Sequence, residues 1–98
     1  PVTDNVLEYA VTLVAKTRPN GEKTHELAKQ YLEWGAGPRA SQYLIYGAKC
    51  NAILAGKYSP DIEDVKAVAH AVLSHRIVRN FKAEAEGYTE AKIITELL

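Results

Sequence analysis

An arginine occupies an unusual position in the stretch EWGAGPRASQYL, residues 33–44. Proline favours the first position of a helix, so Pro38 is expected to open a helix and Arg39 to fall in its first turn. The amides of a helix start carry partial positive charge, which favours an anion and disfavours a cation. An arginine beside such amides suits a phosphate group. The alternative is an exposed arginine, or one paired with Glu33.

No other residues form a recognisable catalytic or metal site. His70 and His75 are five residues apart, which places them about 140° apart around a helix, so they are not expected to share a metal. The acid-rich segments DIEDVK and KAEAEG are expected to be solvated faces. Cys50 lies in an apolar helical pattern and is predicted to be an inert core thiol, which favours a reducing compartment.

The composition fits one small globular domain. The chain has 98 residues, of which 47% are hydrophobic, and its 12 basic residues balance its 12 acidic ones. A net charge of zero argues against a general affinity for nucleic acid or for an anionic membrane. No apolar run approaches the roughly 20 residues that span a bilayer. The chain begins at Pro1 without a methionine, which is consistent with a piece of a longer protein.

Apolar periodicity and capping residues predict an all-α bundle of four to five helices. The predicted ranges are 4–16, 24–34, 38–55, 60–73 and 90–98, with Thr3, Ser59 and Thr89 as N-caps and Gly56 as a helix stop. The third helix is expected to be central. Its packing face would include Ala40, Tyr43, Leu44, Gly47, Ala48, Ile53 and Leu54, whose small members would let another helix approach closely. Only HRIV, residues 75–78, is β-like, and it has no obvious partner.

Several segments together resemble a known family. WGAGPRASQYLIYGAK, GKYSPDIEDVKAVAHAVLSHRI and EAEGYT occur in this order, and the resemblance covers most of the chain. They are similar to the C-terminal lid domain of MoxR-type AAA+ ATPases, relatives of the ATPase subunit of magnesium chelatase. Family members often have prolines where this chain has His70 and Ala71, so a continuous helix is expected there.

The resemblance implies a role for the opening stretch. It matches the sensor 2 motif of the family, so Gly37, Pro38, Arg39 and Ala40 would bind the nucleotide. Arg39 would be the catalytic contact to the terminal phosphate of ATP. Residues 1–98 would be a single lid domain. The phosphate-binding loop, the Mg²⁺ ligands and the arginine finger would belong to an α/β core that precedes it. The chain alone is therefore not expected to hydrolyse ATP.

The resemblance also implies partners. They would be the N-terminal AAA+ core of the same protein, neighbouring subunits of a hexameric ring and a client protein that is remodelled or activated in the cytoplasm. Arg39 could serve the ATP of its own subunit or of a neighbour. Two other hypotheses remain: a free-standing helical module that recognises an acidic peptide through Arg39, and a helix-turn-helix DNA binder. The zero net charge argues against the DNA binder.

Overall fold

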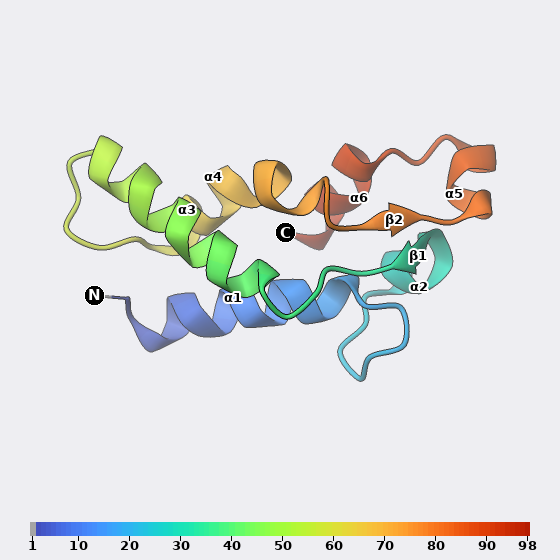
Figure 1. The fold of residues 1–98 in the computed structure, drawn as a ribbon, viewed down its shortest axis with the longest axis horizontal. Coiled ribbons are helices and arrows are strands. Elements are labelled where there is room, and N and C mark those ends of the chain that lie inside the picture. Colours follow the sequence, from blue (N-terminus) through green and yellow to red (C-terminus); the bar gives the residue numbers. More distant parts are fainter. Residues whose placement is uncertain (1) are drawn as a thin grey trace.

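The computed structural model describes residues 2–98, which extend over 43 × 24 × 18 Å. Pro1, where the predicted domain begins, lies outside the described residues. The elements in chain order are α1 (Asp4–Thr17), α2 (Glu26–Tyr31), β1 (Leu32–Trp34), α3 (Ala40–Leu54), α4 (Ile62–Leu73), β2 (Val78–Arg79), α5 (Phe81–Glu86) and α6 (Glu90–Leu97). Helices α1, α3 and α4 build one part of the elongated molecule, while β1, β2, α2 and α5 form its other end (Figure 1). The predicted helical fold class is confirmed.

The helices bury their apolar faces in one shared core. Helix α1 buries Val6, Ala10 and Leu13, which recur at the helical period, and α6 buries Ile93 and Ile94 against them. Burial of this kind contributes roughly 1.5–3 kcal/mol for each large aliphatic side chain. The predicted first and last helices are therefore confirmed, with ends that differ by one residue. Thr89 caps α6 as predicted, whereas the side chain of Thr3 lies at the start of α1 without bonding to its amides.

Helices α3 and α4 make the most extensive contact between elements. A Cβ atom added at Gly47 would lie 3.0 Å from Cγ2 of Val68, so the predicted close approach at this glycine is confirmed. The predicted packing face was partly wrong, because Tyr43, Ile53 and Leu54 are exposed. The core takes only one narrow row of small and apolar side chains from α3: Ala40, Leu44, Ala48 and Ala52.

Residues 32–34 were wrongly predicted to be helical. The backbone becomes extended at Leu32, and β1 pairs with β2 as an antiparallel ribbon in which Leu32 faces Arg79 and Trp34 faces Val78. The β-like segment at 75–78 thus finds a partner more than forty residues earlier in the chain. A small two-stranded sheet is therefore added to the predicted all-helical bundle.

Two predicted helix starts were also displaced. Pro38 and Arg39 lie in a turn, and the helix begins at Ala40 with Arg39 in the N-cap position. The fourth helix is capped by Asp61 rather than Ser59, because the side chains of Asp61 and Asp64 form a reciprocal capping box. It continues through residues 70 and 71, as expected from the missing prolines.

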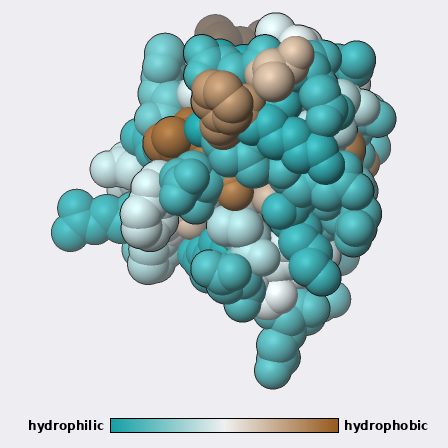
Figure 2. All heavy atoms as spheres, turned by 90° about the vertical axis from the view of Figure 1, so that its right-hand side faces the viewer, coloured by the Kyte–Doolittle hydropathy of each residue, from teal (hydrophilic) through white to brown (hydrophobic). Residues whose placement is uncertain are grey.

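The end of the molecule formed by α2 and α5 is joined by an aromatic contact. The rings of Tyr31 and Tyr88 stack with centroids 4.2 Å apart. The Tyr31 hydroxyl donates a 2.7 Å hydrogen bond to Glu86, which raises the pKa of Tyr31 to about 12. Figure 2 shows that this end is mostly hydrophilic, with a small group of hydrophobic residues near the upper edge of the view. Exposed Val78 and Phe81 belong to this region of the chain.

A buried carboxylate joins the end of α3 to the start of α4. Asp64 accepts hydrogen bonds from the Asn51 side chain and the Asp61 amide, both at 2.8 Å, and lies 2.6 Å from the Lys57 ammonium. The Lys57 ammonium, followed by the Asp61 amide, holds the pKa of the Asp64 carboxyl well below its usual range. Asp64 in turn raises the pKa of Lys57.

The close contact at Gly47 predicts a packing cost. Gly47→Leu should lower the free energy of unfolding by about 1–3 kcal/mol in urea titrations, because its side chain would overpack the contact with Val68. Adding Val68→Ala should restore part of that loss, since it opens space at the same contact. Lys49→Leu, at an exposed α3 position, should change it by about 0.5 kcal/mol or less. A single Gly47 variant as stable as the wild type would contradict this packing.

The Asp64 network predicts a stability that depends on pH. A carboxyl with a lowered folded-state pKa stabilises the fold above its unfolded pKa of about 3.9, and this contribution is lost as the pH falls further. Asp64→Asn should therefore melt at a lower temperature than the wild type above about pH 5, and the difference should shrink toward pH 2. Glu63→Gln, a neighbouring exposed site, is the control. A difference that stays constant from pH 7 to pH 2 would contradict this assignment.

Candidate functional site

The loop from β1 to α3 is pressed against the C-terminal end of α1. A Cβ atom added at Gly35 would lie 2.4 Å from the Thr17 carbonyl oxygen and 2.6 Å from Cα of Arg18. Both neighbours are backbone atoms, which cannot move aside without displacing α1. Only glycine therefore fits at this point of the loop.

Hydrogen bonds fix the same loop one residue later. The Thr17 hydroxyl is buried, donates to the Val14 carbonyl at 2.7 Å and accepts from the Ala36 amide at 2.9 Å. Arg18 Nε donates to the Ala36 carbonyl at 3.1 Å. Both polar groups of Ala36 are thus held by the end of α1. No signal in the sequence indicated these positioning residues, because Thr17 and Arg18 lie just beyond the predicted first helix.

The predicted site residues lie together just after this anchored point. Gly37, Pro38 and Arg39 are exposed, whereas Ala36 and Ala40 on either side of them are buried. Arg39 therefore projects from a short turn that is held at both ends. Within residues 2–98, Arg39 makes no ion pair with Glu33 or with any other acid, and its side chain makes no hydrogen bond to the chain.

The start of α3 lacks the usual groups that satisfy helix amides. No side chain caps it, and its first turn contains no acid. Asp61, Asn80 and Thr89, by contrast, each cap their own helix with a side-chain oxygen. The amides of the first turn of α3 and the guanidinium of Arg39 thus form a positive region without an acidic partner.

A second arginine lines the same hollow. Arg76, which follows α4, borders the open hollow together with Gly37, Pro38, Arg39 and Ala40. Its Nη1 donates a 2.7 Å hydrogen bond to the Val72 carbonyl near the C-terminal end of α4. Its proximity to Arg39 was not predicted, because it depends on how α3 packs against α4.

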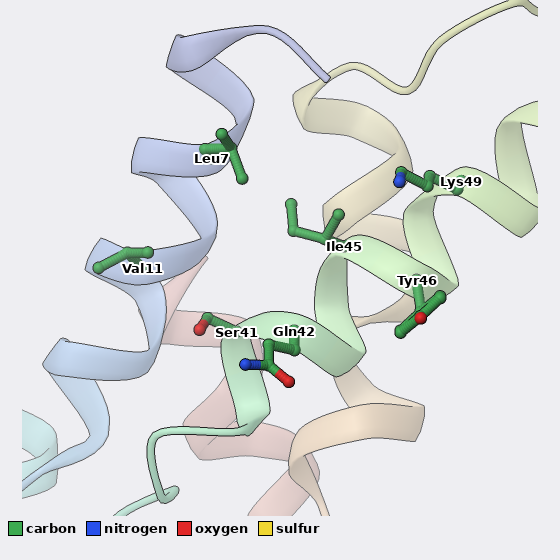
Figure 3. Close-up of a pocket in the computed structure, with 7 residues that line it drawn as sticks. All are labelled: Leu7, Val11, Ser41, Gln42, Ile45, Tyr46 and Lys49. Carbon is green, nitrogen blue, oxygen red and sulfur yellow. The ribbon is translucent and has the colours of Figure 1, made fainter. Parts of the chain in front are cut away.

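A second hollow, a mainly apolar groove, lies between α1 and α3. Figure 3 shows Leu7 on α1 and Ile45 on α3 pointing toward each other, with Val11 further along α1 and polar side chains of α3 nearby. Leu7, Val11 and Tyr46 are all substantially exposed. The groove is lined by Leu7, Val11, Ser41, Gln42, Ile45, Tyr46 and Lys49. On α3 it begins at Ser41, two residues after Arg39, and it has the character of a protein-contact surface.

The remaining reactive side chains do not form a site. Within residues 2–98, no group of three His, Cys, Asp or Glu residues is placed to hold a metal ion. The Nε2 atom of His70 lies 2.9 Å from the Thr95 hydroxyl, where it joins α4 to α6. Cys50 was wrongly predicted to be a core thiol, because the buried row of α3 passes through Ala48 and Ala52 and leaves Cys50 exposed.

The geometry thus describes a small helical module with a cationic helix start and an apolar groove beside it. Residues 24–97 match the AAA lid domain, and the chain therefore belongs to the AAA lid domain family. Chaperone MoxR1 of Mycobacterium tuberculosis is 30% identical over 93 residues, which are 95% of this chain and 25% of that protein. The chain resembles the lids of MoxR-type AAA+ proteins, as its motifs predicted.

A solved structure supports the same assignment. The crystal structure of a candidate ATPase from Cytophaga hutchinsonii matches 98% of this chain with a TM-score of 0.88 and 34% identity, and the match covers 29% of that protein. The chain thus spans between a quarter and a third of the length of these two relatives. Within residues 2–98, no helix is both long and apolar enough to cross a membrane.

The contact at Gly35 predicts an unequal response of two nearby glycines. Gly35→Ala should lower the free energy of unfolding by about 3 kcal/mol, because the added methyl group would meet the α1 backbone. Gly37→Ala is the matched control, since an added Cβ there meets no atom within 4 Å. It should change stability by about 0.5 kcal/mol or less. Equal stabilities of the two variants in chemical denaturation would contradict the anchoring of this loop.

Proposed function

We propose that this chain is the lid of a MoxR-type ATPase and that Arg39 is its sensor 2 residue, which contacts the terminal phosphate of ATP. The observation that carries the proposal is the state of Arg39: exposed, without an acidic partner and at an uncapped helix start. An arginine offers several N–H donors in a planar arrangement, which suits a two-pronged contact to phosphate oxygens. Gly37, Pro38 and Ala40 would shape the turn that directs it.

The residues present fit one side of a nucleotide site. They offer cationic and amide donors to an anion, but residues 2–98 contain no glycine-rich phosphate loop of the P-loop type. ATP and Mg²⁺ would therefore be held mainly by an α/β core outside this chain. Bound Mg²⁺-ATP supplies the phosphoryl group and its charge; the part of Arg39 is to donate hydrogen bonds where negative charge develops.

The anchored loop offers a route from the phosphate contact to movement of the lid. Arg39 is separated by two residues from Ala36, whose amide and carbonyl are both bonded to the end of α1. Ala40, directly after Arg39, is the first residue of α3 and is buried in the core. A displacement of the Arg39 guanidinium would thus move α1 and α3 together. Binding of ATP would clamp lid and core, and hydrolysis would release the clamp.

The proposed partners follow from this arrangement. The core of the same protein and the neighbouring subunits of a hexameric ring would surround the nucleotide, and the cycle would drive chaperone-like remodelling of a client protein in the cytoplasm. The name of the relative Chaperone MoxR1 supports a chaperone-like role. The exposed groove beside α3 supports a protein partner close to Arg39.

The same groove is the observation that favours the alternative of a helical protein-interaction module. Under that alternative, Arg39 would meet an acidic peptide rather than a nucleotide. The two functions differ in what the arginine does in the full-length protein. A sensor 2 residue controls hydrolysis, whereas a peptide-binding residue controls only the affinity for the peptide.

Arg39 variants test the proposed function. Arg39→Ala should leave the stability of this chain within about 0.5 kcal/mol of the wild type, because the exposed side chain makes no hydrogen bond or ion pair within residues 2–98. In the full-length protein it should lower the rate of ATP hydrolysis by one or more orders of magnitude, measured as phosphate release. Arg39→Lys should recover little activity, since an ammonium cannot reproduce the planar contact.

A control variant at another exposed cation and a measurement on rings of mixed subunits complete this experiment. Lys29→Ala removes an exposed charge from α2 and should leave hydrolysis unchanged. Rings that mix wild-type and Arg39→Ala subunits should show whether the contact lies within one subunit or between two. Unfolding of the isolated chain by Arg39→Ala, with normal hydrolysis by the surviving full-length variant, would contradict the proposed role and indicate a structural arginine.

A further inference from the structure

We propose that Arg76 is a second phosphate-binding residue of the lid and acts beside Arg39 on the same terminal phosphate of ATP. The inference rests on the proposed function, because the ligand is the one assigned there to Arg39. It goes beyond that function by giving the site a second cation from a different helix. The two arginines come from opposite ends of the α3–α4 region of the sequence and line one hollow.

The sheet helps to bring the two arginines together. Trp34 and Val78 are paired across the β1–β2 ribbon. Arg39 lies five residues after Trp34, and Arg76 lies two residues before Val78. The ribbon and the packing of α3 against α4 therefore set the positions of both chain segments before any ligand is present.

Arg76 is held in place by a partner that α3 supplies. Its guanidinium carbon lies 4.4 Å from the centre of the Tyr43 ring, in a cation–π contact. Tyr43 is four residues after Arg39, so both lie on the same face of α3 or at its start. The side chain of Arg76 is thus directed toward the α3 start rather than free in solvent.

Arg76 keeps most of its hydrogen-bonding capacity in this position. A guanidinium has five N–H donors. The one hydrogen bond that the Arg76 side chain makes within residues 2–98 is from Nη1 to the Val72 carbonyl. The Val72 bond and the Tyr43 ring fix the group, while other donors stay available to an external acceptor. This is the arrangement expected of a preorganised binding residue.

The charges around the hollow favour an anion. Arg79, only three residues further on, lies 3.3 Å from Glu90, and Lys57 is paired with two aspartates. Within the described part of the chain, neither Arg39 nor Arg76 has such a partner, and no acid lines their hollow. Two guanidinium groups in one hollow disfavour each other. A phosphate group, with its several oxygens and its negative charge, would satisfy both.

The experiment uses the full-length protein with Arg76→Gln, which keeps a polar side chain and removes the charge. We expect hydrolysis to fall by about tenfold or more, as for other donors to developing charge. The affinity for ATP should fall more than that for ADP, because only ATP has the terminal phosphate. A merely structural role would not separate the two nucleotides. Tyr43→Phe keeps the ring under Arg76 and should behave as the wild type, whereas Tyr43→Leu should reproduce part of the Arg76→Gln defect.

Controls separate this inference from the proposed function. Lys66→Gln removes an exposed cation of α4 and should change neither hydrolysis nor nucleotide affinity. If Arg39→Ala is defective while folded Arg76→Gln hydrolyses and binds ATP normally, the inference is overturned and the proposed function stands. If neither variant affects ATP but both weaken binding of a polyglutamate peptide, both proposals fall in favour of peptide recognition.

Folding is checked on the same variants. Thermal melts should place Arg76→Gln within a few degrees of the wild type, since it loses only surface contacts, those with the Val72 carbonyl and the Tyr43 ring. Should Arg76→Gln fail to fold, Arg76→Lys provides the test: it keeps the charge above Tyr43 but not the planar donors, and the proposal expects reduced hydrolysis with a greater loss of affinity for ATP than for ADP. Full activity of Arg76→Lys with unchanged nucleotide affinities would overturn it.

Discussion

The backbone contact between Gly35 and the end of α1 is the constraint on which the other features of the site depend. It brings two chain segments closer than any side chain would allow, so the loop cannot shift along α1. Because the loop is fixed there, the Ala36 amide meets the buried Thr17 hydroxyl, and the chain enters α3 in one direction. The exposed turn that carries Arg39 is therefore rigid at its base although its tip lies in solvent.

The helix starts of this chain differ in how their free amide groups are satisfied. Most of them satisfy their own amides, with the Asp61–Asp64 capping box as the strongest example. Helix α3 instead has a cation at its start and no cap. The unfavourable interaction between this cation and the helix dipole is about a few tenths of a kcal/mol. It is small beside the stabilisation from the apolar burial of Leu44 and its neighbours. The fold can thus tolerate an unfavourable local charge where a ligand would offset it.

Local signals in the sequence predicted the described helices except α5, but they could not predict the contacts that shape the site. The periodic apolar residues of α1 and the glycine stop of α3 are local features, and both predictions were confirmed. The pairing of Leu32 with Arg79 and the hollow shared by Arg39 and Arg76 depend on residues far apart in the chain. The prediction that Cys50 is buried was wrong for a related reason. In a helix with small core residues, an apolar side chain between two buried positions can still face outward. The motif around Arg39 led to the family assignment, whereas its role in binding phosphate stays a prediction.

The two arginines and the start of α3 offer cationic and amide donors to an anion, while no three metal-ligating side chains within residues 2–98 are placed to hold a metal ion. On the proposed function, their role would depend on lying on a domain that moves relative to the core. On the proposed function, the phosphate would bridge this rigid cationic corner and a separate core, so the contact would exist only while the terminal phosphate is present. Because Arg39 is anchored through α1 and Arg76 is fixed on Tyr43 between α3 and α4, loss of that phosphate would release the three main helices as one unit. A lid built in this way would turn a change of one phosphate group into displacement of a whole domain, which a flexible, singly attached arginine could not do.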